Sequence, residues 1–158
     1  MYTKNIAKCF SNISSIIKST PLEYNQRLSN IHSCNIFLKR EDIQLTRSFK
    51  IRGASNKIIN NMNIVKNNGV VCASAGNHAQ GIAYCCNKFN IDGTIFIPNN
   101  TPLQKKKRIE FFGGKYINII QHGNNFNECL DHALNYSNDK LFIHPFDDDE
   151  IINGQATV

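Results

Sequence analysis

The chain has 158 residues, of which 41% are hydrophobic and 19% are charged, a composition typical of a globular protein and not of a disordered chain. No apolar run approaches the roughly 18 residues that a membrane-spanning helix needs, so the sequence predicts no membrane span. The net charge of +6 includes one dense basic run, Lys105 to Arg108, at an expected helix start. Because aromatic or recognition-helix support is missing, this run indicates a solvated helix face and not a nucleic-acid interface.

The thiols and imidazoles show no ligand pattern. The six cysteines are Cys9, Cys34, Cys72, Cys85, Cys86 and Cys129. None forms a C-x-x-C pair, and the five histidines have no metal-ligand spacing, so no metal site is predicted. No continuous apolar stretch near the N-terminus marks a signal peptide. We therefore expect reduced thiols that act as small core residues in a cytoplasmic protein.

The first expected element is an amphipathic helix near the N-terminus. The apolar residues that share one face of this helix are Ile6, Phe10, Ile13 and Ile17. Thr20-Pro21 should end the helix, because the residue before a proline avoids the α region. A short apolar strand is then expected at residues 36–38, followed by a charged and polar segment over residues 39–48.

From Lys50 onward, helices alternate with short apolar strands. The expected helices span residues 50–61, 77–89, 102–112, which Gly113-Gly114 should stop, and 126–136. The expected strands span residues 70–73, 94–97, 116–120 and 141–143. The four carboxylates of residues 147–150 suit the positive end of a helix dipole and should open another helix. This order predicts an α/β fold, an open parallel sheet with helices on both faces.

The turn after the strand at 70–73 is the first candidate for chemistry. Its sequence runs from Ser74 to Gly81 as Ser-Ala-Gly-Asn-His-Ala-Gln-Gly. Ligands of parallel sheets bind at the carboxyl ends of the strands, small residues allow close approach, and a helix start offers N–H groups to an anion. The same residues are also compatible with a plain tight turn in which Asn77 caps the helix. Both interpretations stay open on these grounds.

The second candidate is Lys50, within Ser-Phe-Lys-Ile-Arg-Gly-Ala at residues 48–54. A cation at a helix start faces the dipole unfavourably, which should lower the pKa of the Lys50 amine. A less protonated amine is what Schiff-base chemistry needs. For an isolated lysine, an exposed residue without a function is the better interpretation.

The two candidates together resemble the threonine dehydratase family, which belongs with serine dehydratase and serine racemase to the β-family of pyridoxal-phosphate enzymes. The first matching motif is Lys39-Arg40-Glu41-Asp42, followed by the motifs at 48–54 and 74–81. The likeness also includes Thr20-Pro21-Leu22, Pro98, Thr101-Pro102, Gly113-Gly114, residues 144–148 (His-Pro-Phe-Asp-Asp) and residues 153–157 (Asn-Gly-Gln-Ala-Thr). It covers nearly the whole chain from Thr20 onward, in the family's order and spacing.

The resemblance implies a role for each residue of both motifs. Lys50 would carry pyridoxal 5′-phosphate on its ε-amine, Phe49 would pack against the cofactor ring, and Asn77 would bind the ring's 3′ oxygen. The loop residues that would hold the substrate carboxylate are Ser74, Ala75, Gly76, Asn77 and His78. For Arg52 and His78, a purely structural role is an equally good interpretation.

The resemblance also implies a fold and a reaction. The fold would be like that of the tryptophan synthase β subunit, with a small α/β domain at residues 47–145. Residues 1–46 and 146–158 would be parts of a larger, incomplete domain. The reaction would be the dehydration and deamination of L-threonine to 2-oxobutanoate and ammonia in isoleucine biosynthesis, with serine as a possible second substrate. The full-length protein would be a homo-oligomer.

Two departures from the family pattern qualify this hypothesis. Ala156 stands where the family has a glycine and is expected to crowd a close backbone approach, and the chain stops at Val158, before the family's glycine-rich phosphate-binding loop. We therefore expect a truncated chain without turnover of its own, whose N-terminal helix lacks a partner for its apolar face. The alternatives are a serine racemase or serine dehydratase, and a non-catalytic remnant or half of a split enzyme.

Overall fold

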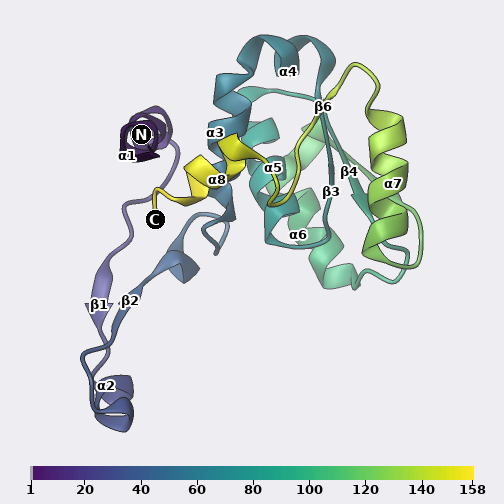
Figure 1. The fold of residues 1–158 in the computed structure, drawn as a ribbon. Helices are drawn as coiled ribbons and strands as arrows, with labels where there is room; N and C mark the ends of the chain where they lie inside the picture. Colours follow the sequence, from purple (N-terminus) through teal and green to yellow (C-terminus); the bar gives the residue numbers. More distant parts are fainter. Residues whose placement is uncertain (1) are drawn as a thin grey trace.

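The computed structural model describes the backbone of residues 2–158 and the side chains of residues 5–158. The helices are α1 Tyr2–Ile13, α2 Gln26–His32, α3 Lys50–Asn60, α4 Met62–Asn68, α5 Asn77–Phe89, α6 Leu103–Gly113, α7 Phe126–Ser137 and α8 Asp149–Gln155, with the 3-10 turns η1 Glu41–Ile43 and η2 Gly114–Tyr116. The strands are β1 Leu22–Tyr24, β2 Phe37–Lys39, β3 Val70–Ala73, β4 Gly93–Ile97, β5 Ile117–Gln121 and β6 Leu141–Phe142. Figure 1 shows helices around a sheet, and the β1–β2 ribbon with α2 extending away from it.

The main sheet has the strand order β5-β4-β3-β6, and every pairing in it is parallel. The two central strands, β3 and β4, are buried at every residue. Such strands read as continuous apolar runs because helices cover both faces of a parallel sheet. The smaller antiparallel pair, β1 and β2, has only exposed residues.

Alternate residues of the central strands face two separate cores. Cys72 and Ile95 pack in a cluster with Ile58 of α3, Ile82 of α5 and Ile109 of α6. On the opposite face, the cluster of buried residues is Val71, Ala73, Phe96, Cys129 and Ala133, the last two from α7. The predicted α/β fold, with a parallel sheet and helices on both faces, is therefore confirmed.

The elements that sequence patterns did not predict are β1, α2 and α4. The first two lie in the polar N-terminal third, where three-residue strands carry too short a pattern to recognise. Helix α4 follows α3 after a break at Asn61, and three of its seven residues are asparagine, a weak helix former. The predicted helix stop at Gly113-Gly114 is confirmed, because Gly114 is the C-cap of α6 and has a positive φ of 55°.

Helix α1 forms as expected, but its buried face differs from the predicted one. It ends at Ile13, before Ile17, and Phe10 is 48% exposed. The residues of this segment that are buried are Cys9, Ile13 and Ile16. Helix α1 packs on α3 and α8, so the expectation that its apolar face has no partner is wrong for Ile13, which is fully buried.

Helices α3 and α8 meet at two glycines. A Cβ atom on Gly154 would lie 2.6 Å from the Cα of Gly53, and one on Gly53 would lie 2.8 Å from the carbonyl oxygen of Ile151. Only glycine leaves room for such a backbone approach. Ala156 does not crowd this contact, contrary to expectation, because it is exposed and has ordinary helical dihedral angles.

A buried ion pair fixes the same interface. Arg52 donates from Nε and Nη2 to the two carboxylate oxygens of Glu41, at 2.9 and 2.7 Å, and from Nη1 to the carbonyl oxygen of Thr157 at 3.0 Å. Burial raises the pKa of Glu41, but hydrogen bonds from Arg52 and Thr20 outweigh it and the net shift is downward. Arg52 is 1% exposed, so it serves the structure and does not face a ligand. We call this set, Glu41, Arg52, Gly53, Gly154 and Thr157, the α3–α8 interface.

The remaining composition-based expectations concern the surface. Lys105, Lys107 and Arg108 are exposed on α6, as a solvated helix face should be. The expectation that the cysteines are core residues is wrong for Cys34, which is exposed, whereas the other five are buried. In the part of the chain that the structure describes, no helix is both long and apolar enough to cross a membrane.

Candidate active site

The strand order marks one place in this sheet for a ligand. From β3 the sheet grows through β4 to β5 on one side, whereas β6 lies on the other side of β3. Ligands of open parallel sheets bind outside the carboxyl ends of the strands where the order reverses in this way. The loop of residues 74–78 follows β3 and the turn of residues 143–147 follows β6, so both lie at this point.

Lys50 reaches this point from the start of α3. Its Nζ donates a 2.8 Å hydrogen bond to the carbonyl oxygen of Pro145. Burial of the side chain lowers the pKa of the Lys50 amine. This is the direction expected from the sequence, and burial is its cause. Among the residues that the structure describes, Lys50 forms no ion pair, so no carboxylate opposes the loss of its proton.

The turn that holds Lys50 is organised by a histidine. The Nδ1 atom of His144 accepts hydrogen bonds from the backbone N–H groups of Phe146, at 3.3 Å, and Asp147, at 2.8 Å. Asp148 then caps α8 by accepting from the backbone N–H groups of Glu150 and Ile151. The acidic run at 147–150 therefore opens a helix, as predicted, with Asp148 as its cap.

The loop of residues 74–78 presents an open helix start. Ser74 Oγ accepts from the N–H of Gly76 at 3.2 Å, and Gly76, not Asn77, is the N-cap of α5. The interpretation of Asn77 as a capping residue is therefore wrong. No side chain caps this end of α5, and a Cβ on Gly76 would meet nothing within 4 Å. The start of this 13-residue helix therefore has no side-chain cap and has open space beside Gly76, a combination that suits an anion.

His78 joins the loop to the turn. Its Nε2 lies 3.2 Å from the carbonyl oxygen of Ile143, and the residue is buried, with only 3% of its surface exposed. Burial lowers its pKa to about 4, so the ring is neutral at physiological pH. The buried Nδ1 atom has no hydrogen-bond partner in the described part of the chain.

The structure brings most of the expected site residues to one place. Lys50 and His78 bind carbonyl groups two residues apart in the same turn. A Cβ on Gly81 would lie 3.2 Å from the Cα of Ile51, so the starts of α3 and α5 lie against each other. Phe49 is 40% exposed and Asn77 is exposed, so both side chains are accessible to a ligand. That Lys50 and Asn77 both bind the cofactor stays a prediction.

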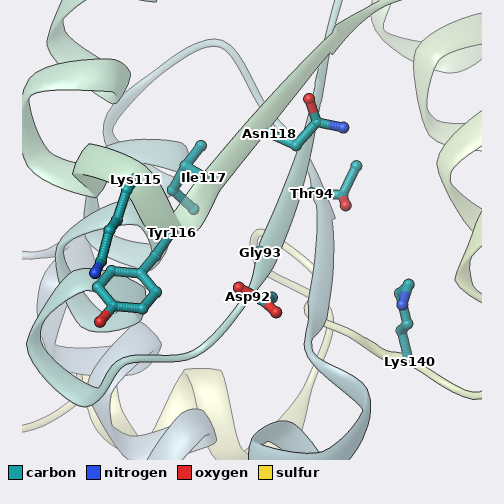
Figure 2. A pocket seen from close by; sticks show the side chains of 8 residues that line it. All are labelled: Asp92, Gly93, Thr94, Lys115, Tyr116, Ile117, Asn118 and Lys140. Carbon is teal, nitrogen blue, oxygen red and sulfur yellow. The ribbon is translucent and has the colours of Figure 1, made fainter.

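A well-defined cavity lies elsewhere. Figure 2 shows a pocket of about 220 Å³ whose lining includes Asp92, Thr94, Lys115, Asn118 and Lys140. These residues precede or begin β4, β5 and β6, so the pocket lies at the amino ends of the strands. Because ligands of parallel sheets bind at the carboxyl ends, this pocket is not the candidate active site.

Comparison with known proteins identifies the family of the chain. The sequence pattern of the family described as pyridoxal-phosphate dependent enzyme matches residues 13–158. The chain belongs to this family. The chain is 48% identical to the biosynthetic L-threonine dehydratase IlvA of Halalkalibacterium halodurans over 92% of its own length. It spans only 36% of that relative.

Solved structures share the fold of this chain. The processed form of threonine deaminase isoform 2 from Solanum lycopersicum superposes with a TM-score of 0.88 at 35% identity, over 99% of this chain and 46% of that one. Maize serine racemase superposes with a TM-score of 0.89 at 29% identity, over 98% of this chain and 46% of that one. The backbone alone therefore does not separate a dehydratase from a racemase.

The strand order reverses at the switch point of the sheet, and the residues there fit the family's cofactor. Pyridoxal phosphate needs a lysine whose amine can lose its proton, and Lys50 is the half-buried lysine whose pKa is lowered. Its neighbour Phe49 offers an exposed aromatic face, and the open space at Gly76 admits a planar ring or a carboxylate. The residues that hold the Lys50 amine, Pro145 and His144, received no role from the sequence. A backbone carbonyl has no residue-type signature, and only its place after β6 could have pointed to it.

Proposed function

We propose that this chain contributes the cofactor-binding part of a threonine ammonia-lyase, which converts L-threonine to 2-oxobutanoate and ammonia in isoleucine biosynthesis. The observation that carries the proposal is the half-buried Lys50 amine, which hydrogen-bonds to a neutral carbonyl beside an uncapped helix start at the switch point of the sheet. The choice of threonine rests on relatives that are named L-threonine dehydratase and are 44–48% identical.

Lys50 has two tasks in this proposal. Its Nζ would hold pyridoxal phosphate, and as a free amine the same group would accept the α-proton of the substrate. Bound pyridoxal phosphate supplies an electron sink for the charge that this proton leaves behind. Because burial lowers the pKa of Lys50, a larger fraction of the amine is neutral and able to accept a proton.

The loop of residues 74–78 binds the substrate carboxylate. The N–H groups at the start of α5 and the Ser74 hydroxyl are hydrogen-bond donors, and the positive end of the helix dipole favours an anion. Ala75 and Gly76 keep the approach free of bulky side chains. The exposed Asn77 amide can donate to the cofactor's 3′ oxygen, and Phe49 can pack on its ring.

Serine racemase or serine dehydratase activity is the second candidate. The TM-score of 0.89 with maize serine racemase favours it as much as the score of 0.88 favours a threonine deaminase. Sequence identity separates them, at 29% for the racemase and 48% for the bacterial dehydratase. We therefore rank threonine first and serine as a possible second substrate.

We also propose a division of the chain and a setting for it. Residues 47–145 form a small α/β domain, and residues 1–46 and 146–158 belong to a larger one. The β1–β2 ribbon with its exposed Tyr24 and Phe37 suits such a second unit, although α1 and α8 pack on α3.

The complete enzyme is a homo-oligomer of the cytoplasm. The remnant and split-enzyme hypotheses both expect the chain alone to lack turnover.

A chimera tests the reaction. The chain replaces the matching part of the 48% identical Halalkalibacterium relative, and product is measured with L-threonine and L-serine. We expect 2-oxobutanoate from threonine and its loss in Lys50→Ala. D-serine as the main product would favour a racemase. A chimera that binds the cofactor on Lys50 but forms neither product would support the non-catalytic remnant.

A further inference from the structure

The turn of residues 143–147 is held from both sides by histidines. A backbone N–H can only donate, so His144 Nδ1, which accepts from Phe146 and Asp147, carries no proton. A backbone carbonyl can only accept, so His78 Nε2 donates to Ile143. The two rings are therefore neutral Nε2–H tautomers, and together they fix the backbone on either side of Pro145.

The fixed turn determines where the Lys50 amine lies. Pro145 is buried and its φ angle is restricted by its ring, so the direction of its carbonyl follows from the turn that His144 closes. Lys50 Nζ donates to this carbonyl at 2.8 Å. When the amine is neutral, one N–H is used in this bond, and the lone pair points away from the carbonyl and stays free to react.

We propose that His144 is a positioning residue for Lys50: by accepting the N–H groups of Phe146 and Asp147, it holds the Pro145 carbonyl that orients the reactive amine. This inference rests on the proposed function, because it assumes that Lys50 is the residue that binds the cofactor. Without the acceptor at position 144, the turn opens and the amine samples orientations from which it does not reach a carbonyl compound.

A matched pair of variants tests the proposal. His144→Phe removes the acceptor and keeps an aromatic ring beside Phe142 and Phe146, whose ring centroids lie 6.3 and 4.6 Å from that of His144. His144→Asn keeps an acceptor, because Asn Oδ1 branches from the same Cγ position as His Nδ1 and closes similar turns. Lys50→Ala supplies the zero level for labelling.

The measurements separate positioning from a merely structural role. The full chain is incubated with pyridoxal phosphate and borohydride, and the labelling rates of Lys50 and of the exposed, distant Lys115 are compared by mass spectrometry. We expect His144→Phe to slow Lys50 labelling about tenfold at unchanged Lys115 labelling, since the variant loses both hydrogen bonds to His144 Nδ1 and a tenfold change corresponds to about 1.4 kcal/mol. His144→Asn should stay within about twofold of the parent. Hydrogen exchange at the Asp147 amide should accelerate only in His144→Phe.

Two results would overturn the proposal. One is fast Asp147 exchange with unchanged Lys50 labelling in His144→Phe, because the turn would then be open without consequence for the amine. The other is a proton on Nδ1 of His144 in the parent chain, seen by ¹⁵N NMR of the imidazole, a measurement that stands if the phenylalanine variant does not fold. A third result concerns the proposed function alone. If Lys50 of the parent chain is labelled no faster than Lys115 while the Asp147 amide is protected from exchange, the proposed function is wrong but the turn geometry is correct.

Discussion

Lys50 and Arg52 lie two residues apart on the first turn of α3, yet they serve two different regions. Arg52 belongs to the α3–α8 interface, where both carboxylate oxygens of Glu41 and a backbone carbonyl use its guanidinium. Lys50 belongs to the candidate active site at the carboxyl ends of the strands, where one neutral carbonyl is its hydrogen-bond partner. The difference shows how one helix separates stability from chemistry, since a cation that is bound by a carboxylate keeps its proton and one that is not can give it up.

Breaking the ion pair should have the largest effect on stability. Glu41→Gln leaves the Arg52 charge buried without a counter-ion, which costs about 3–5 kcal/mol. At roughly 2–4 °C per kcal/mol for a chain of this size, Tm falls by about 6–20 °C. Asp42→Asn is the control, because Asp42 forms an exposed pair with Arg40, and exposed ion pairs contribute little to stability. Equal losses in urea unfolding for both variants would show that Arg52 is not locked in place.

Acid should destabilise the candidate active site through protonation of His78. Its pKa is about 4 when folded and about 6.5 when unfolded, so between these values the unfolded chain binds more protons. Stability is therefore lost as the pH falls from about 6.5 to 4, by up to about 3 kcal/mol. His78→Gln keeps an amide donor for Ile143 and should flatten this slope, whereas His32→Gln on α2 should leave it unchanged. An identical slope in all three proteins would assign it to other groups.

Two glycine substitutions sharpen the contrast between the regions. Gly53→Ala forces a Cβ to within 2.8 Å of the Ile151 carbonyl oxygen and should destabilise the fold by about 1–3 kcal/mol. Gly76→Ala meets nothing within 4 Å and should change stability by no more than about 0.5 kcal/mol. The same Gly76→Ala should weaken cofactor labelling of Lys50, because its methyl group enters the ligand space. The contrast would be refuted if Gly53→Ala and Gly76→Ala had the same effects on thermal unfolding and on the labelling of Lys50.

The smallest effect on stability is expected at Lys50. Lys50→Ala removes one hydrogen bond and relieves the burial of an amine, so unfolding free energy should change by no more than about 0.5–1 kcal/mol. Borohydride labelling with pyridoxal phosphate should disappear. A large loss of stability would mean that Lys50 is a structural residue like Arg52.

Sequence patterns predicted the sheet better than the N-terminal third. Strands such as Val70–Ala73 are buried on both faces, which produces an apolar run that stands out beside Asn77–Phe89, a helix with its own periodicity. The strands Leu22–Tyr24 and Phe37–Lys39 are exposed, so no burial pattern marks them. The face of α1 was misjudged because Ile16, which is buried, lies beyond the helix end at Ile13.

Within the candidate site, the sequence indicated those groups that can be recognised by their residue type. Lys50 and the loop of residues 74–78 were found from their motifs, and the structure places them at one switch point. The roles of Pro145 and His144 were not found, because they depend on a carbonyl direction and on a ring tautomer. Arg52 could not be assigned from sequence, since its partner Glu41 becomes a neighbour only after folding.

The hydrogen bond between Lys50 and Pro145 joins residues 95 positions apart in the chain. During synthesis, the lysine leaves the ribosome long before its acceptor does. Contacts of such high sequence separation form late in folding, because the entropy of closing the intervening loop must be met first. Until β3 and β6 pair, the Lys50 amine of a nascent chain is therefore not yet held by Pro145. The order of assembly alone would then delay the orientation of this amine until the fold is complete.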